Sequence, residues 1–363
     1  MNAFVPHPRP VSHRPGPRGG ILAAAAALAI AVALAACSTG ANPTVSIPAD
    51  ATGSLQPPAT SSAEPSASPL TFPLTLTDDE GTKVELAAEP QKLVSLTPAT
   101  TEILFALGVG DRIVGKVNDP TLYPPEAASI PDVAKYGEVN VEQIVNLAPD
   151  LVIAGGNSFN PPDKIAQLRS LKVPVLVVYA PDIETVLNDI ELTGAAVGKS
   201  EESKDLTASM QAAFDQVGAA TKDLARPRVF YEIDASQKIY TAADDSFLAA
   251  MIELAGGTAI TTGSSTNFEI PLEKLVAADP EIILLGDAAY GGTADIVKAR
   301  AGWNVMTAVK NGAIVPVDDV VITRPGPRLV DGLRALALAI HPDADLPSAA
   351  PSAVGSPGAS ASP

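Results

Sequence analysis

Histidine and cysteine are the scarcest reactive residues of this chain, which has three histidines and one cysteine in 363 residues. Two of the histidines fall in the first 36 residues, and His341 follows the last predicted helix. No Ser-His-Asp triad, Cys-His pair or His/Cys metal cluster can be assembled from them. The sequence also has no Gly-x-Gly-x-x-Gly after its first predicted strand and no Gly-x-x-x-x-Gly-Lys-Ser/Thr phosphate loop. An enzyme would have to rely on carboxylates or tyrosines alone, so we expect no enzyme, no metal site and no cofactor.

Positive charge and aromatic residues are also scarce. The 24 lysines and arginines are outnumbered by 41 aspartates and glutamates, which gives a formal net charge of −17, and the basic residues form no run. This composition lacks the electrostatic footprint of a nucleic-acid-binding protein. Aromatic residues make up only 4% of the chain. Aliphatic residues and alanine dominate instead, and the length is enough for two domains of ordinary size.

The first 36 residues have the pattern of a signal peptide. Arg9, Arg14 and Arg18 precede an unbroken apolar run of 16 residues at positions 21–36, which is short for a membrane span. The run ends in Leu34-Ala35-Ala36 directly before Cys37, the only cysteine. Small residues before a cysteine are typical of a lipoprotein cleavage site, so Cys37 is the expected lipid attachment site. The alternative is an ordinary signal peptide or signal anchor with an incidental cysteine.

Residues 37–70 and 346–363 have the composition of disordered segments. Of the 33 residues at positions 38–70, 25 are Ser, Thr, Ala, Pro or Gly. Such a segment cannot bury enough apolar surface to offset its ordering entropy, and as a flexible chain it spans roughly 30 Å. We predict a tether between a lipid-anchored cysteine and a globular body, and a disordered tail. No cysteine remains for a disulfide, so the core must be large enough to do without one.

The globular part contains a stretch that occurs twice, at residues 140–155 and 271–286. Glu142 falls on Glu273, and a valine, a proline and the final glycine also coincide. Each copy has the pattern of a short amphipathic helix, a turn of proline and an acidic residue, and a buried apolar strand. Two copies about 130 residues apart predict two similar α/β lobes. The alternative is that this pattern is a common connector that unrelated α/β units share.

Predicted strands and helices alternate on both sides of one long helix at residues 201–225. The alternation predicts mostly parallel central sheets with helices on both faces, in lobes at residues 71–200 and 226–345. The proline-rich residues 119–136 are expected to be irregular, and residues 239–242 to form a strand. One continuous helix bends less easily than several loop crossings, so we expect lobe closure to be small.

A ligand is expected in a cleft between the lobes, because ligands of open α/β sheets bind beyond the carboxyl ends of the strands. Thr97-Pro98 fits a helix N-cap with proline at the first position, a pattern that also starts helices without any ligand. The loop at residues 155–160, which includes Asn157, follows one such strand. Arg324, in Thr323-Arg-Pro-Gly-Pro-Arg328 at another strand end, is a candidate contact for an anionic or amide group, whereas Arg328 is expected to serve the closing helix. The aromatic candidates for stacking on a flat ligand, each of which also fits a core or rim position, are Tyr136, Phe159, Tyr240 and Phe268.

Glu142 and Glu273 are candidates for docking to a partner protein. A carboxylate near the start of a helix is favourable by about 0.3–1 kcal/mol, which by itself explains both. Their spacing by one whole lobe favours a second interpretation, in which the two carboxylates pair with arginines of a partner.

Several ordered motifs together resemble the helical-backbone metal-chelate binding proteins, which are the ABC-transporter substrate-binding proteins for vitamin B12, ferric siderophores and haem. The resemblance covers residues 72–342 and implies two Rossmann-like lobes joined by one long helix, an extracytoplasmic lipoprotein, and delivery of cargo to a membrane permease with its ATPase. The motifs are residues 93–108, 123–126, 140–153, 268–273 and 324–328.

Carried over by position, the resemblance assigns Glu142 and Glu273 to permease arginines. It places cobalamin-pocket positions on Pro98, Tyr136, Phe268 and Tyr240. Two tryptophans that such pockets often use are replaced here by Gly155 and Phe268. Ferric catecholate binders usually concentrate basic residues in the cleft, and here only Lys116, Lys135, Lys238 and Arg324 are candidates. A haem binder would want an axial ligand, for which Tyr136 and Tyr240 are the candidates.

The sequence therefore predicts a monomeric, lipid-anchored extracytoplasmic protein that captures a metal chelate and presents it to an ABC importer. The identity of the chelate, corrinoid, ferric siderophore or haem, stays open. Two other classes remain as alternatives: a chelatase-like enzyme on the same two-lobed scaffold, and a cell-surface scaffold or adhesion protein.

Overall fold

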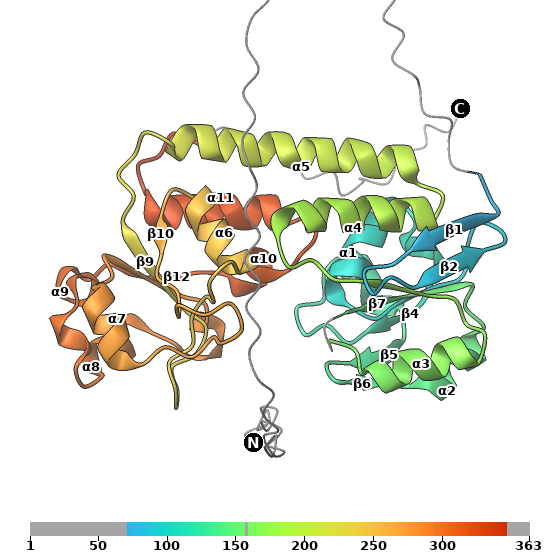
Figure 1. Ribbon diagram of the computed structural model, residues 1–363, viewed down its shortest axis with the longest axis horizontal. Helices are drawn as coiled ribbons and strands as arrows, with labels where there is room; N and C mark the ends of the chain where they lie inside the picture. The colour runs from blue at the N-terminus through green and yellow to red at the C-terminus, as the bar shows by residue number, and fades with distance from the viewer. Residues whose placement is uncertain (1–70, 157–158, 347–363) are drawn as a thin grey trace, which may run out of the picture. The chain divides into compact units, whose positions relative to one another are not determined.

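The computed structural model describes residues 71–156 and 159–346 (Figure 1). The predicted signal peptide, Cys37, the tether, Asn157 and nearly all of the predicted tail lie outside the described residues. Among the described residues, no helix has the length and apolar character needed to cross a membrane.

The N-terminal lobe contains a six-stranded sheet in the order β6-β5-β4-β3-β7-β8. All neighbours are parallel except β5 and β6. A two-stranded hairpin, β1 (Leu74–Thr77) and β2 (Lys83–Leu86), precedes the sheet. The strands of the sheet are β3 (Leu93–Ser95), β4 (Ile113–Val117), β5 (Asp132–Lys135), β6 (Glu138–Val139), β7 (Leu151–Gly155) and β8 (Val175–Val178). Its helices are α1 (Pro98–Ala106), α2 (Val141–Leu147), α3 (Pro162–Ser170) and α4 (Ile183–Ala196), with 3-10 turns at Gly110–Arg112 and Pro125–Ser129.

The C-terminal lobe contains a smaller, four-stranded parallel sheet in the order β10-β9-β11-β12. Its strands are β9 (Arg228–Glu232), β10 (Thr258–Ala259), β11 (Ile282–Leu285) and β12 (Ile314–Pro316). Its helices are α6 (Phe247–Leu254), α7 (Leu272–Ala278), α8 (Ala294–Ala299), α9 (Thr307–Asn311), α10 (Asp319–Thr323) and α11 (Leu329–Ile340), with 3-10 turns at Ala288–Tyr290 and Trp303–Val305.

Both sheets are buried on both faces, which is why their strands read as continuous apolar runs. Leu151 and Ile153 of β7 point into one apolar cluster, while Val152 and Ala154 point into another. In the second lobe, Tyr231 likewise joins the first cluster, and its neighbour in β9 joins a third cluster on the opposite face. This alternation follows from the two-residue period of a strand.

A long helix, α5 (Ser200–Thr221), connects the two lobes, as the sequence predicts. It packs against α4 of the first lobe and α11 of the second, and Figure 1 shows it running alongside both. One face is buried, at positions spaced by three and four residues: Ser203, Thr207, Met210, Phe214, Val217 and Thr221.

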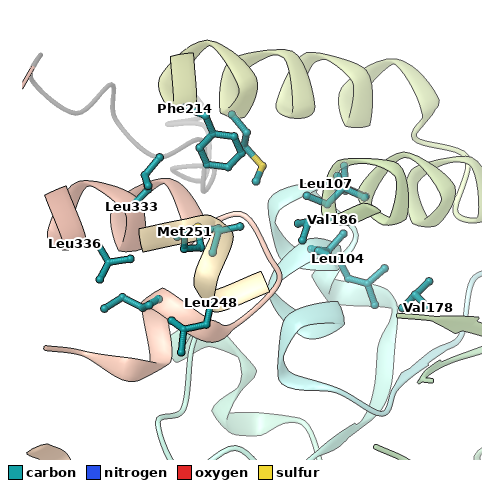
Figure 2. Packing of buried hydrophobic residues seen from close by; sticks show 14 of the residues in the cluster. Leu104, Leu107, Val178, Val186, Phe214, Leu248, Met251, Leu333 and Leu336 are labelled. Atoms are coloured by element: carbon teal, nitrogen blue, oxygen red, sulfur yellow. The ribbon is translucent and has the colours of Figure 1, made fainter. Parts of the chain in front are cut away.

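The largest apolar cluster continues from one lobe into the other past this helix. Figure 2 shows Leu104 and Val186 of the first lobe, Phe214 of α5, and Leu248 and Leu333 of the second lobe as members of one cluster. The lobes are therefore joined by shared packing as well as by the chain itself.

Two local predictions are wrong. Residues 119–136 are not irregular throughout, since β5 lies within them and pairs with β4 and β6. Residues 239–242 form no strand of the sheet; Tyr240 makes only isolated antiparallel bridges to Asp234 and Glu269. The edge position of the second sheet is taken instead by the two-residue strand β10.

Candidate functional site

The loops at the carboxyl ends of the two sheets meet through Arg324. Its guanidinium lies after α10 and donates to Asp119, which follows β4 of the other lobe, at 2.9 and 3.2 Å. It also donates to Glu102 of α1 at 2.6 Å and to the hydroxyl of Thr121 at 3.2 Å. These contacts bring the carboxyl edges of both sheets to the same part of the molecule, which is where the sequence predicts the ligand.

Arg328 joins the same cluster, which we call the interlobe clasp: Glu102, Asp119, Arg324 and Arg328. Arg328 donates to both carboxylate oxygens of Glu102, at 3.0 and 2.7 Å, and its guanidinium carbon lies 3.7 Å from the ring centre of Tyr123. The prediction that Arg328 serves its own helix is wrong, because its side chain binds the opposite lobe and makes no side-chain cap on α11.

The charges of the clasp are buried but matched. The side chain of Glu102 is 2% exposed and that of Arg324 is 13% exposed. Burial by itself would raise the pKa of Asp119, but hydrogen bonds from Arg324 and Thr121 outweigh it and hold that pKa below its ordinary value. Burial would lower the pKa of Arg328, and Glu102 outweighs it and raises that pKa. The ion pairs of the interlobe clasp thus favour the charged forms of Asp119 and Arg328.

On the first lobe, the predicted ligand residues Pro98, Tyr136 and Phe159 lie at the carboxyl ends of β3, β5 and β7. Pro98 opens α1 behind Thr97, whose side chain accepts from the backbone N–H of Thr100 and caps the helix. Tyr136 is 74% exposed, and its ring meets that of Phe159 edge-on with centres 5.4 Å apart. The exposed ring of Tyr136 and the half-buried ring of Phe159 thus form an aromatic pair at the predicted edge.

Asn160, which the sequence did not single out, fixes the loop that carries Phe159. Its amide donates to the carbonyl of Leu96 after β3, and its oxygen accepts from the N–H of Gly155 at the end of β7. Gly155 has no room for a side chain, since a Cβ there would lie 2.7 Å from a methyl carbon of Thr97 and 3.1 Å from Phe159. The close approach of three segments explains the glycine at this position.

On the second lobe, Tyr240 and Phe268 lie on neighbouring segments. The N–H of Thr241 donates to the carbonyl of Phe268, and Tyr240 bridges to Glu269. Phe268 is 45% exposed and Tyr240 is half-buried. The structure thus brings Tyr240 and Phe268 together on the second lobe. The aromatic pair of Tyr136 and Phe159 belongs to the first lobe.

The carboxyl edge of the second sheet also carries a charged cluster that the sequence did not predict. Glu232, the fully buried last residue of β9, accepts a bidentate ion pair from Arg300, which stacks on Trp303 at 4.6 Å. Asp287 follows β11 beside Glu232. Burial, and then the neighbouring charge of Glu232, raise the pKa of Asp287 to about 6.

Glu142 and Glu273 lie in the first turns of α2 and α7, and both are exposed. Their helices have matching bounds, and each ends in a left-handed residue, Ala148 (φ 49°) and Asp279 (φ 44°). The repeat is therefore present in the backbone structure as well as in the sequence.

Two cavities in the described part of the chain are each lined by one lobe alone. The larger, of about 780 Å³, lies on the first lobe beside Tyr136, between the segments that contain Asn118, Lys135, Gln143 and Lys164. The smaller, of about 440 Å³, lies at the start of α6. The same residues contain no cluster of three or more potential metal ligands. The cleft position of a ligand thus stays a prediction.

Comparison with known proteins gives the family. The family described as periplasmic binding protein matches residues 93–321. An uncharacterized ABC transporter substrate-binding lipoprotein of Bacillus subtilis (strain 168), YvrC, is 34% identical over 277 residues, covering 75% of this chain and 87% of that protein. A cobalamin-binding protein of Halobacterium salinarum is 31% identical over 281 residues, covering 74% of each chain. This chain belongs to the periplasmic binding protein family.

The fold is shared with solved structures. The periplasmic haem-binding protein RhuT of Roseiflexus sp. RS-1, in its apo form, matches with a TM-score of 0.62 and 26% identity, covering 69% of this chain and 98% of that one. The relatives are solute-binding proteins and not enzymes, which confirms the expectation that this chain is not an enzyme.

Proposed function

We propose that this protein is the lipid-anchored, extracytoplasmic substrate-binding protein of an ABC importer, and that it captures a metal chelate and delivers it to a permease. The observation that carries the proposal is the meeting of the two sheets' carboxyl edges through Arg324, in a member of the periplasmic binding protein family. The relatives named for cobalamin and haem support a chelate as cargo.

The character of the edge favours a flat or bulky conjugated chelate over a small polar solute. Tyr136 offers an exposed ring on the first lobe, beside the half-buried ring of Phe159, and Phe268 offers an exposed ring on the second. Aromatic rings gain from stacking on flat conjugated ligands. Basic residues contribute little, because Arg324 is paired in the interlobe clasp, Lys116 is paired with Asp132, and Lys238 is paired with Glu269. A corrinoid is therefore favoured over a ferric catecholate, whose negative charge would need free cations.

Docking to the permease is assigned to Glu142 and Glu273. Both carboxylates are exposed and stand at equivalent points of the two lobes, so they suit two arginines of a partner with matching symmetry. The acylated Cys37 and the tether would hold the protein at the membrane, and a monomer is sufficient because one chain supplies both carboxylates.

The test combines ligand binding with transport. Purified mature protein is titrated with cyanocobalamin, a ferric hydroxamate and haemin, and uptake of the bound chelate is then measured in cells. We expect a dissociation constant below about 1 µM for one of the three chelates. Replacing Glu142 and Glu273 by lysine should abolish uptake and leave affinity unchanged, because both side chains are exposed and neither belongs to the proposed ligand contacts.

Replacing Glu201 and Glu202 by lysine is the matched control, since both glutamates also lie in the first turn of a helix and are exposed. This variant should transport normally. Failure of all three chelates to bind would overturn the proposal, and normal uptake by the Glu142/Glu273 variant would overturn the docking assignment.

A further inference from the structure

The structural repeat extends beyond the stretch that the sequence displays. A shift of 131 positions carries Val141–Leu147 (α2) exactly onto Leu272–Ala278 (α7) and the start of β7 onto the start of β11. The same shift carries the left-handed Ala148 onto the left-handed Asp279. The two lobes therefore share helix bounds, the left-handed residue that ends the helix and the start of the following strand.

The match continues into the loop after the strand. On the first lobe, the N–H of Phe159 donates to the carbonyl of Gly156 at 3.1 Å. On the second lobe, the N–H of Tyr290 donates to the carbonyl of Asp287 at 2.8 Å. Both donors and both acceptors are related by the same shift of 131 positions. Phe159 and Tyr290 thus occupy structurally equivalent positions, although the residues around them differ between the two copies.

Tyr290 has the features expected of a ligand contact. It ends the 3-10 turn Ala288–Tyr290 at the carboxyl end of β11 and is 86% exposed, more than any other large hydrophobic or aromatic side chain among the described residues. Gly291 follows with a positive φ of 106°, which turns the chain sharply after the tyrosine.

Backbone hydrogen bonds hold the turn that carries Tyr290 in place. Asp287, the residue whose carbonyl accepts from Tyr290, lies beside the buried Glu232–Arg300 ion pair, and its backbone carbonyl also accepts from Gly292. The turn is thus closed by two hydrogen bonds to one residue. An exposed ring on an anchored turn loses little conformational entropy when it binds a ligand.

The loop also lies on the correct side of the lobe. β12 is the neighbour of β11 in the sheet, and the chain that leaves β12 carries Arg324, which contacts Asp119 and Thr121 of the first lobe. The carboxyl ends of parallel strands share one edge, so Tyr290 belongs to the edge of the second lobe that meets the first lobe.

We propose that Tyr290 is a ligand-contact residue, which supplies from the second lobe the aromatic contact that Phe159 supplies from the first. The inference rests on the proposed function and specifies its cargo: a flat conjugated metal chelate, held between rings contributed by equivalent turns of the two lobes. The contact is made by the ring and not by the hydroxyl, since the equivalent residue of the first lobe is a phenylalanine.

The test uses calorimetric titration of the full mature protein with cyanocobalamin and with haemin. Replacing Tyr290 by alanine should weaken binding of the chelate that the wild type prefers by about tenfold or more. Replacing Tyr290 by phenylalanine should leave the affinity within about threefold, because the ring is kept. Replacing Leu338, an exposed residue of α11 away from the strand ends, by alanine is the control and should change nothing.

The outcomes separate this inference from the function on which it rests. If the wild type binds neither chelate, the flat conjugated cargo is wrong and the inference fails, while binding of a ferric hydroxamate would leave the proposed function standing. If the wild type binds and Tyr290→Ala binds equally well, the function stands and Tyr290 is not a contact. If Tyr290→Phe loses as much affinity as Tyr290→Ala, the hydroxyl is the contact and the ring assignment is wrong.

Discussion

Asp189 is a buried acid with no positive partner among the groups that perturb it. It lies on α4, is 6% exposed, and its carboxyl contacts Asp79 of the entry hairpin, with Asp182 nearby. Burial, and then the charge and hydrogen bond of Asp79, raise the pKa of Asp189 to about 8. At neutral pH it is therefore protonated and donates a hydrogen bond to the carboxylate of Asp79.

This pKa makes stability depend on pH with a definite sign. The carboxyl titrates near its ordinary value of 3.8 in the unfolded chain and near 8 in the folded chain. Folding therefore takes up a proton between these values, and the free energy of unfolding falls as the pH rises from about 4 to about 8.

Replacing Asp189 by asparagine should remove this fall in the free energy of unfolding at rising pH. The amide has nearly the same shape and donates to Asp79 at every pH, so the variant should be more stable than the wild type by on the order of 2 kcal/mol above pH 8 and nearly equal at pH 4.5. Thermal unfolding followed by circular dichroism across this range measures the difference. Asp223→Asn, at an exposed position, should follow the wild type; parallel curves for Asp189→Asn and wild type would refute the assignment.

At the scale of elements, the turn between α10 and α11 is the part of the second lobe that grips the first. Arg324 and Arg328 of this turn both donate to Glu102 of α1. Gly326 lies between them against the backbone of α1, where a Cβ would be 3.7 Å from the carbonyl oxygen of Ala99. The turn thus fixes the lobes at one point, and the shared apolar cluster fixes them along α5.

Replacing Glu102 by alanine should therefore be strongly destabilising. It leaves the buried guanidiniums of Arg324 and Arg328 without their common partner, a change that typically costs about 3–5 kcal/mol. Urea unfolding at neutral pH measures the loss. Glu201→Ala, which removes an exposed ion pair with Lys204, is the control and should cost less than about 1 kcal/mol. Similar losses for the two variants would show that the interlobe clasp contributes no more than a surface ion pair.

The elements that the sequence predicts well are those whose pattern is local. The long helix predicted at residues 201–225 is found at Ser200–Thr221 (α5), because its buried residues recur at helical spacing. The repeat likewise predicts α2 and α7 and the buried strands β7 and β11 that follow them. The strands β5 and β10 were missed because they are short edge or near-edge strands whose pairing depends on distant neighbours.

The candidate site shows the same division between local and distant information. Tyr136 and Phe159 were identified because strand ends and aromatic residues can be read along the chain. The pairing of Arg324 with Glu102 could not be predicted, because Glu102 lies 222 residues away in the sequence and is buried only once the two lobes pack together. Tyr290 was not predicted because the two copies of the repeat share backbone hydrogen bonds at this loop but no longer share residue identities.

At the scale of the whole molecule, one bracing helix and a shared core hold the two lobes together. The apolar cluster that joins Leu104, Phe214 and Leu333 makes large hinge opening costly, in line with the small closure expected from α5 alone (Figure 2).

The most direct measurement is native mass spectrometry of the protein purified from its source cells after growth with cyanocobalamin and haemin. The account predicts a mass that exceeds the acylated chain by one metal chelate, which is released when the protein is unfolded in acid. A mass explained by the chain and its lipid alone, under conditions that keep the fold intact, would contradict the claim that the two lobes exist to carry a chelate.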